Sequence, residues 1–357
     1  MAKQSRFDVS KFINPSQVGG IDAYTIDEGE GRGVRALAVN TGGGLRYRVL
    51  PDRGLDIDQA FFNQHSLTFL SHKGVTPPTR ALDRGLDWLK GFPVGLLTSC
   101  GPSGMGAPCN DQGEEVGLHG PHSNTAAAIE SVIQPDPRAG RNQMMIVGRV
   151  RTGAFYGPCY ELRRTIVSTL GENWIDIEDE ILNAGNTRQP HGWLLHINLG
   201  YPLIDEGAVF CYDASRVEPV GGSAESAAWF SAPNDYKRCR GPMKEHRGPN
   251  SFVGYIYPRA DRGGMATVGV VNRKLKLGLA IHYNVNEFTR CTNWQHWGLR
   301  EYVAALEPCT GSVEGRDKDR KAGILPFLAP GERKTYRYRI EAVADREGLE
   351  ALLALNG

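Results

Sequence analysis

The chain has 357 residues, and its 41 lysines and arginines nearly balance its 40 aspartates and glutamates, which argues against nucleic acid or an anionic membrane as a partner because both require concentrated positive charge. Its first residues lack the apolar core of a secretory signal, and no apolar run approaches the ~20 residues that cross a bilayer. The seven cysteines are odd in number and never form a CxxC pair, so we expect a cytoplasmic protein with reduced thiols rather than a disulfide framework or a structural zinc site.

Glycine and proline divide the chain into short segments, several of which alternate apolar and polar residues as half-buried strands do. In chain order the predicted strands are 34–39, 45–50, 143–150, 159–167, 173–182, 193–199, 251–257, 266–271, 275–285 and 336–342, with a hairpin turn at Gly171. Leucines at helical spacing predict two peripheral helices, over 80–90 and 346–355. Stretches rich in glycine and proline at 91–109 and 241–250 predict long loops, which are often functional in a compact β domain.

The order of these elements indicates the fold class. Turns rather than long helical patterns separate the strands, which disfavours a parallel βαβ architecture. The strands on either side of a conceivable boundary near residue 110 share the same character, so a single domain over 1–357 is the simpler interpretation. The sequence therefore predicts a large, mainly antiparallel, all-β sandwich with few short peripheral helices.

The first candidate for chemistry is a loop that contains two histidines. His119 and His122 lie three residues apart between glycines, in the segment Gly117–Asn124. In an extended segment their side chains would point in different directions, so a shared metal ion would need a turn that the sequence does not guarantee. We expect one of the two to face a site. The alternative for each is a histidine whose ring is bonded to a backbone carbonyl.

The second candidate is His196, in the strand predicted over 193–199. Strand periodicity places His196 on one face with Leu194 and Asn198, and it places His191 on the face of Trp193. A metal site that uses both histidines is therefore disfavoured.

The third candidate is Glu307, which follows the apolar segment 302–306 and precedes Pro308. We expect the proline to end the strand there. Partial burial would raise the pKa of this carboxyl group into the range that suits a general base, if a sugar hydroxyl or a histidine lies within reach. The alternative is an exposed charge at the end of an edge strand.

Aromatic and charged residues elsewhere suit a carbohydrate ligand. Trp294, His296 and Arg53 are candidates, because sugar sites combine stacking rings with charge-assisted hydrogen bonds. The alternative is that the tryptophan belongs to the core and the arginine to the surface.

Taken in order, several segments resemble the aldose 1-epimerase (galactose mutarotase) superfamily, in particular a divergent bacterial branch classed as a domain of unknown function (DUF4432-like). The resemblance covers most of the chain and implies the large galactose mutarotase-like β-sandwich, also called a supersandwich. The segments that carry it are Gly44–Ile57, Leu118-His119-Gly120 with Ser123-Asn124-Thr125, His196-Ile197-Asn198-Leu199-Gly200, Leu306-Glu307-Pro308 and Leu328-Ala329-Pro330-Gly331-Glu332.

The resemblance also implies roles for single residues. By motif, His119 would bind the sugar, His196 would act as the acid and Glu307 as the base of a carbohydrate isomerase. Glu307 would take the proton of the anomeric hydroxyl while His196 protonates the ring oxygen, and no cofactor or metal would be needed. We further expect Asn198 and His122 to contact the substrate, a free sugar or sugar derivative.

Two features depart from the family. The arginine that mutarotases place shortly before their His-Gly motif has no counterpart in Gly95–Gly101, and Arg53 is a hypothetical replacement for it. His122 stands where this branch would carry a basic residue. The identity of the sugar is therefore left open, as is the formation of a homodimer.

Two further functions stay open at this point. One is a metal-assisted epimerase, isomerase or lyase whose ion is held by His119, His122 and His196 with a carboxylate such as Glu114 or Glu115. The other is a sugar-binding or sugar-sensing protein without turnover.

Overall fold

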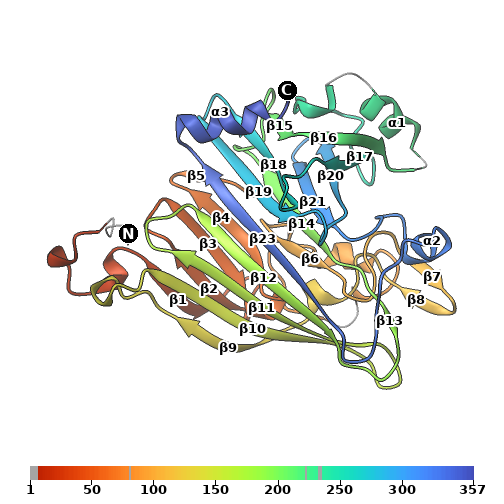
Figure 1. The fold of residues 1–357 in the computed structure, drawn as a ribbon, viewed down its shortest axis with the longest axis horizontal. Coiled ribbons are helices and arrows are strands. Elements are labelled where there is room, and N and C mark those ends of the chain that lie inside the picture. The colour runs from red at the N-terminus through yellow and green to blue at the C-terminus, as the bar shows by residue number, and fades with distance from the viewer. Residues whose placement is uncertain (1–6, 80–81, 222, 232–234) are drawn as a thin grey trace.

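The computed structural model describes residues 7–79, 82–221, 223–231 and 235–357, and antiparallel sheets make up most of it (Figure 1). The predicted fold class is confirmed. An eight-stranded sheet runs in the order β15-β18-β19-β23-β12-β11-β10-β9. Its members are β9 (Ala127–Ile133), β10 (Gln143–Gly153), β11 (Cys159–Thr169), β12 (Trp174–Asn183), β15 (Val209–Tyr212), β18 (Met265–Asn272), β19 (Leu277–Asn284) and β23 (Arg333–Val343).

Two other sheets pack against this one. The five-stranded sheet contains β1 (Gly20–Thr25), β2 (Arg35–Asn40), β3 (Leu45–Leu50), β4 (Asp56–Phe62) and β5 (His65–Ser66). The six-stranded sheet, in the order β16-β17-β20-β21-β14-β6, contains β6 (Thr98–Cys100), β14 (Leu194–Gly200), β16 (Ala214–Pro219), β17 (Phe252–Pro258), β20 (Arg290–Trp297) and β21 (Tyr302–Cys309). A bridge between Ile57 and Leu97 joins the two, and all three sheets contribute to one hydrophobic core.

The predicted alternation explains how the eight-stranded sheet forms. Along β11 and β12 every second residue is buried, as period-two patterning requires. Ile166 lies opposite Ile177 in the antiparallel register of the hairpin. The turn between the strands contains Gly171 at a φ of +85°, a conformation that favours glycine.

Short elements surround the sheets. The two-stranded pairs are β7 (Cys109–Asp111) with β8 (Glu114–Val116), and β13 (Gln189–Pro190) with β22 (Phe327–Leu328). The α-helices in the described part of the chain are α1 (Ala224–Ser231), α2 (Arg316–Lys321) and α3 (Arg346–Ala354). None of these helices has the length and apolar character that a membrane span requires.

One of the two predicted helices is confirmed, and the other is wrong. α3 forms where the C-terminal leucines predicted it, with the side chain of Asp345 accepting from the backbone N–H of Gly348 at its N-terminus. Over 80–90 only a 3₁₀ turn, η5 (Asp87–Lys90), is present among the described residues. Gly85 adopts a φ of +48°, which breaks a right-handed helix, and residues 80–81 lie outside the described residues.

The six-stranded sheet is buried on both faces near its middle. Every residue of β14 is buried. Leu195, Ile197 and Leu199 face the common core, whereas Leu194 belongs to a second apolar cluster with Trp88 and Met105. His196 and Asn198 share the face of Leu194, because side chains alternate along a strand. Loops therefore cover the outer face of this sheet, and the candidate site lies between the sheet and the loops.

Candidate functional site

His196 and Glu307 come from neighbouring strands at the centre of the six-stranded sheet. The register of β14 and β21 pairs Leu194 with Cys309 and Ile197 with Leu306, so His196 falls across from Glu307. Residues opposite each other on one face of an antiparallel pair have adjacent side chains. The structure accordingly places His196 Nε2 3.2 Å from Glu307 Oε1.

Pro308 does not end β21, contrary to the prediction. The strand continues to Cys309, and Glu307 therefore lies inside a central strand rather than at the end of an edge strand. A proline has no N–H to donate to the ladder, and pairing with β14 is interrupted between the Leu194 and Ile197 partners. The interruption coincides with His196, so the pairing of β14 with β21 is open where His196 and Glu307 meet.

Burial controls the electrostatics of this pair. His196 is 6% exposed and Glu307 is 2% exposed. Burial lowers the pKa of His196 to about 4, although a hydrogen bond to Asn198 opposes the shift. Burial also raises the pKa of Glu307 well above its ordinary value. Both shifts disfavour charge, so the pair rests as a neutral imidazole and a protonated carboxyl group rather than as an ion pair.

Glu307 is incompletely satisfied within the protein. Its Oε1 atom has no hydrogen-bond partner among the described residues, and His196 Nε2 lies 3.2 Å from it. A buried carboxyl oxygen without a partner is unfavourable, and in a native structure it calls for an explanation such as a ligand or a catalytic role.

His119 approaches the same pair from the loop that covers the sheet. Its ring centroid lies 5.4 Å from that of His196, nearly perpendicular to it. Its Nδ1 accepts from the backbone N–H of Gly106, so in the neutral ring Nε2 carries the proton. The backbone of His119 adopts a φ of +59°, rare for a residue other than glycine, and strain of this kind often accompanies functional sites.

Aromatic rings form the walls of the site. The Trp88 ring lies 4.6 Å from His119 and 4.2 Å from Phe92, and Phe92 lies 5.2 Å from His196. The ring of Trp294, on β20, lies 5.5 Å from that of His196, nearly perpendicular to it, and Trp294 is partly exposed. Trp294 was among the residues expected from the sequence, whereas Trp88 and Phe92 were not. Trp88 lies in η5, within the segment that was wrongly predicted as a helix, and Phe92 lies in the loop predicted over 91–109, which was the one available signal.

Trp294 lies between His296 and the pair of His196 and Glu307 in the chain of ring contacts. The ring of His296 stacks on Trp294 at 6.0 Å rather than on His196. Nδ1 donates to the carbonyl of Asn250 at 2.9 Å, and Nε2 lies 3.6 Å from Glu301 Oε2. The structure thus brings His296 against the tryptophan wall, where it supports the indole.

The expected contact of His122 with substrate is not supported by its position. The side chain is 0% exposed, Nε2 donates to the carbonyl of Gly54 at 3.0 Å, and the ring packs edge-on against Trp193. Burial and the nearby Arg164 lower the pKa of His122 to about 3. It is therefore a neutral core histidine, which was the alternative stated for it.

Arg53 likewise lies away from His196 and Glu307, and its buried side chain connects several loops through hydrogen bonds. It is 3% exposed, and its guanidinium donates to the carbonyls of Thr76, Gly91 and Ser123 and to the Thr76 hydroxyl. Burial lowers its pKa to about 10. These bonds occupy the guanidinium, so Arg53 positions the segments that carry Trp88 and Phe92 instead of replacing a sugar-binding arginine.

The metal cluster that was left open as an alternative does not form among the described residues. No group of three or more histidines, cysteines, aspartates or glutamates in this part of the chain is arranged to hold an ion. Glu114 binds Arg316 at 2.7 Å, and Glu115 accepts from Asn110 at 2.6 Å. His122 is bonded to Gly54, so one of the three histidines and both carboxylates face other partners.

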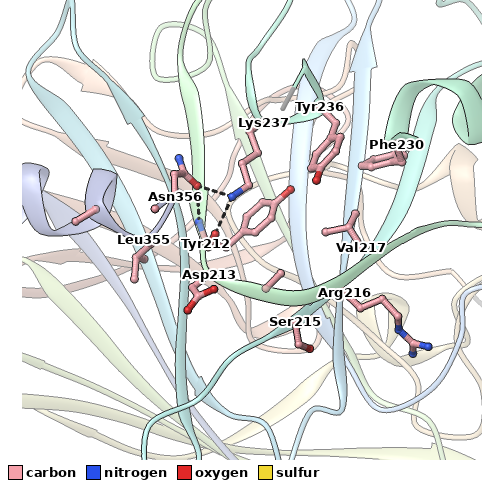
Figure 2. A pocket seen from close by; sticks show the side chains of 13 residues that line it. Tyr212, Asp213, Ser215, Arg216, Val217, Phe230, Tyr236, Lys237, Leu355 and Asn356 are labelled. Carbon is pink, nitrogen blue, oxygen red and sulfur yellow. Dashed lines mark hydrogen bonds between the residues drawn. The ribbon is translucent and has the colours of Figure 1, made fainter. Parts of the chain in front are cut away.

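A cavity of about 520 Å³ lies elsewhere, between β15, β16 and the C-terminal residues (Figure 2). Lys237 donates to the Tyr212 carbonyl and to Asn356 Oδ1, at 3.0 and 2.8 Å. The described residues that line it include neither histidine nor glutamate. This cavity therefore lacks the acid–base groups that His196 and Glu307 supply.

Comparison with known proteins identifies the family. A family model described as "Domain of unknown function (DUF4432)" matches residues 31–342, and the chain belongs to this family. None of the curated proteins compared with it matches. The resemblance to a divergent branch of the aldose 1-epimerase superfamily is confirmed by this match together with the folds of solved structures.

Three solved structures illustrate the shared fold. A Klebsiella pneumoniae protein described provisionally as an aldose 1-epimerase is similar with a TM-score of 0.84 at 22% identity, over 96% of this chain and 89% of the other. A galactose mutarotase-like protein from Clostridium acetobutylicum has a TM-score of 0.62 at 10% identity, over 91% and 98%. Galactose 1-epimerase from Lactobacillus acidophilus has a TM-score of 0.55 at 10% identity, over 90% and 98%. At these identities the likeness shows the fold.

Proposed function

We propose that this protein is a carbohydrate isomerase that interconverts the anomers of a free sugar or sugar derivative, with Glu307 and His196 as its acid–base pair. The observation that carries the proposal is the 3.2 Å approach of a buried imidazole nitrogen to a buried, unpartnered carboxyl oxygen beside aromatic rings. A general acid and a general base must lie within reach of the same substrate, and the raised pKa of Glu307 makes its carboxylate a stronger base.

Ring opening needs one proton to leave and one to arrive. The reactive form of the pair is the one in which the shared proton has moved from Glu307 to His196 Nε2. From this form Glu307 takes the proton of the anomeric hydroxyl, and the protonated Nε2 of His196 gives its proton to the ring oxygen as the C1–O5 bond breaks. The pair then holds its proton on Glu307 instead of on His196. After the aldehyde rotates, the reverse transfers close the ring on its other face, so the cycle consumes nothing and returns the pair to its starting state.

The surrounding residues suit a sugar ring. Nε2–H of His119 can donate to a ring substituent, since its Nδ1 is held by Gly106. Trp88, Phe92 and Trp294 offer apolar faces that match the C–H surfaces of a sugar and exclude water from the proton transfers.

The direct test is exchange NMR on a panel of reducing aldoses, ketoses and sugar acids. The wild-type protein should accelerate exchange between the anomers of at least one member. Glu307→Gln and His196→Gln should each slow that exchange by about 10²- to 10⁴-fold, the usual contribution of a positioned acid or base.

Glu301→Gln is the matched control, because Glu301 also lies beside a histidine, at 3.6 Å from His296, but is largely exposed. It should retain exchange within about twofold of the wild-type rate. A panel without acceleration by the wild-type protein would oppose the proposal. Saturable binding of a sugar without accelerated exchange would favour a sugar-sensing protein.

A further inference from the structure

The amide of Asn198 has an unambiguous orientation. Its Nδ2 faces three carbonyl oxygens, those of His196, Gly95 and Val94, at 2.9, 3.0 and 3.3 Å. Turning the amide over would place Oδ1 against these acceptors, and the side chain is 0% exposed, so water cannot compensate. Oδ1 must therefore point at His196 Nδ1, which lies 2.5 Å away.

The loop before β6 is shaped to supply two of those carbonyls. Val94 adopts a φ of +70°, which is strongly disfavoured for a β-branched residue, and Gly95 follows at +73°. A Cβ at Gly95 would lie 2.6 Å from Asp58 Cα, so only glycine fits there. Backbone bonds hold the loop in place, including the one from Gly95 N to the Phe69 carbonyl at 2.9 Å. Strain of this kind persists where the surroundings over-determine it.

From this geometry we infer that Asn198 is a positioning residue rather than a substrate ligand, and that it locks His196 in the tautomer with a proton on Nδ1 and the lone pair of Nε2 facing Glu307. An acceptor oxygen requires a donor, so Nδ1 keeps its proton at all times. The remaining exchangeable proton of the pair then lies between Nε2 and Glu307 Oε1. The tautomer follows from the hydrogen bonds alone, and only its consequence for catalysis rests on the proposed function.

The tautomer decides whether His196 can act as an acid. With Nδ1 protonated, Nε2 gains a proton as imidazolium and returns to the neutral ring when it donates. With Nδ1 bare, Nε2–H could donate only by forming an imidazolate, which is far less stable. The hydrogen bond from Nδ1 to a fixed acceptor is how proteins select the reactive nitrogen of a histidine. Both ends of the Asn198 amide are occupied, which leaves none for a sugar.

The test is ¹⁵N NMR of histidine-labelled protein without any substrate, with the His196 signals assigned by their loss in His196→Gln. In the wild-type protein at neutral pH, Nδ1 of His196 should show the shift of a protonated nitrogen. In Asn198→Leu, Nδ1 loses its acceptor, and the proton should move to Nε2, where it can bond to Glu307.

Asn293→Leu is the matched control. Asn293 is also a buried strand asparagine, and its Nδ2 donates to the Ala305 carbonyl at 3.1 Å on the core side of the same sheet. This variant should leave the His196 tautomer unchanged. For anomer exchange, Asn198→Leu should lower kcat by about 10²-fold or more while KM changes little, because only the proton transfers are affected.

An unprotonated Nδ1 in the wild-type protein would overturn the inference, and so would an identical tautomer in Asn198→Leu. If Asn198→Leu does not fold, the wild-type spectrum alone decides. Since no sugar is present, a failure of the proposed function would show itself in the exchange assay and leave this spectrum as predicted.

Discussion

Two buried clusters of ionisable residues lie on opposite sides of β6, and they differ in how completely their hydrogen bonds are made. On the core side, Arg164 binds Asp179 at 2.6 and 2.8 Å, Asp56 at 2.9 Å and the Ser99 hydroxyl at 2.8 Å. Asp179 also accepts from Trp193 and Tyr338. On the loop side, His196 and Glu307 face each other with one carboxyl oxygen unpartnered.

The difference separates a structural role from a chemical one. A charged cluster whose donors and acceptors are all used ties sheets together and has no capacity left for a ligand. A buried pair with a free oxygen costs stability that only a function or a ligand explains. By this reasoning the Arg164 cluster holds the fold, and the His196–Glu307 pair is the one for which we propose a chemical role.

Glu307→Gln gives the largest contrast. Anomer exchange should fall by about 10²- to 10⁴-fold, while the free energy of unfolding should stay the same or rise. Burial raises the pKa of Glu307. At a pH above the ordinary pKa of glutamate, the unfolded state therefore releases a proton that the folded state retains, and this difference lowers the free energy of unfolding. Glutamine removes that cost. The exchange assay measures the loss of activity, and chemical denaturation measures the free energy of unfolding. A large loss of stability in Glu307→Gln would contradict the distinction between the two clusters.

Arg164→Met should show the opposite pattern. It leaves Asp56 and Asp179 buried without their cation, and removal of one partner of such a pair costs about 3–5 kcal/mol. Denaturation should reveal the loss, and any protein that remains folded should still exchange anomers. A stable Arg164→Met protein would show that the core cluster does not hold the sheets together.

The pH dependence of stability tests whether His122 is a neutral histidine of the core. The pKa of His122 falls from an ordinary 6.5 to about 3, so between these values the unfolded state binds a proton that the folded state does not. Stability should therefore decline as the pH falls from 6.5 toward 3. In His122→Gln one proton fewer is taken up on unfolding, so the slope of the free energy of unfolding against pH should fall by about 1.4 kcal/mol per pH unit. Unfolding curves across this range measure the slope, and an unchanged slope would argue against burial of a neutral His122.

Trp294→Leu should have the smallest effect. The indole borders the acid–base pair without taking part in proton transfer, so we expect a loss of about 1 kcal/mol in sugar binding. KM should rise about fivefold with kcat nearly unchanged. Steady-state kinetics on the sugar selected by the panel separates the two constants. A loss confined to kcat would place Trp294 in the chemistry instead.

Much of the fold follows from local patterns in the sequence. Strands such as β11 and β12 alternate regularly and pair in the expected hairpin, with Ile166 opposite Ile177. Elements without such a pattern were missed. The helix α2 consists of charged residues, and it is held by bonds from Arg316 and Arg320 to Asp111 that lie about 200 positions apart in the chain.

The candidate site was predictable in part. Motifs pointed to His119, His196 and Glu307, and the structure brings these three side chains together. The expected substrate contacts of Arg53 and His122 are not supported by their positions, because a sequence does not reveal whether the hydrogen bonds of a polar residue are made by distant carbonyls. The contacts of these two residues join segments as far apart as Thr76 and Ser123, or Gly54 and His122. Local pattern carries no information about such bonds.

The most direct test is a crystal structure of Glu307→Gln with the sugar that the exchange panel selects. The account predicts a monosaccharide ring between Trp88 and Trp294, with its anomeric oxygen within about 3.2 Å of residue 307 and its ring oxygen toward His196 Nε2. A sugar bound only in the cavity beside Lys237, with the space at His196 left empty, would contradict the account.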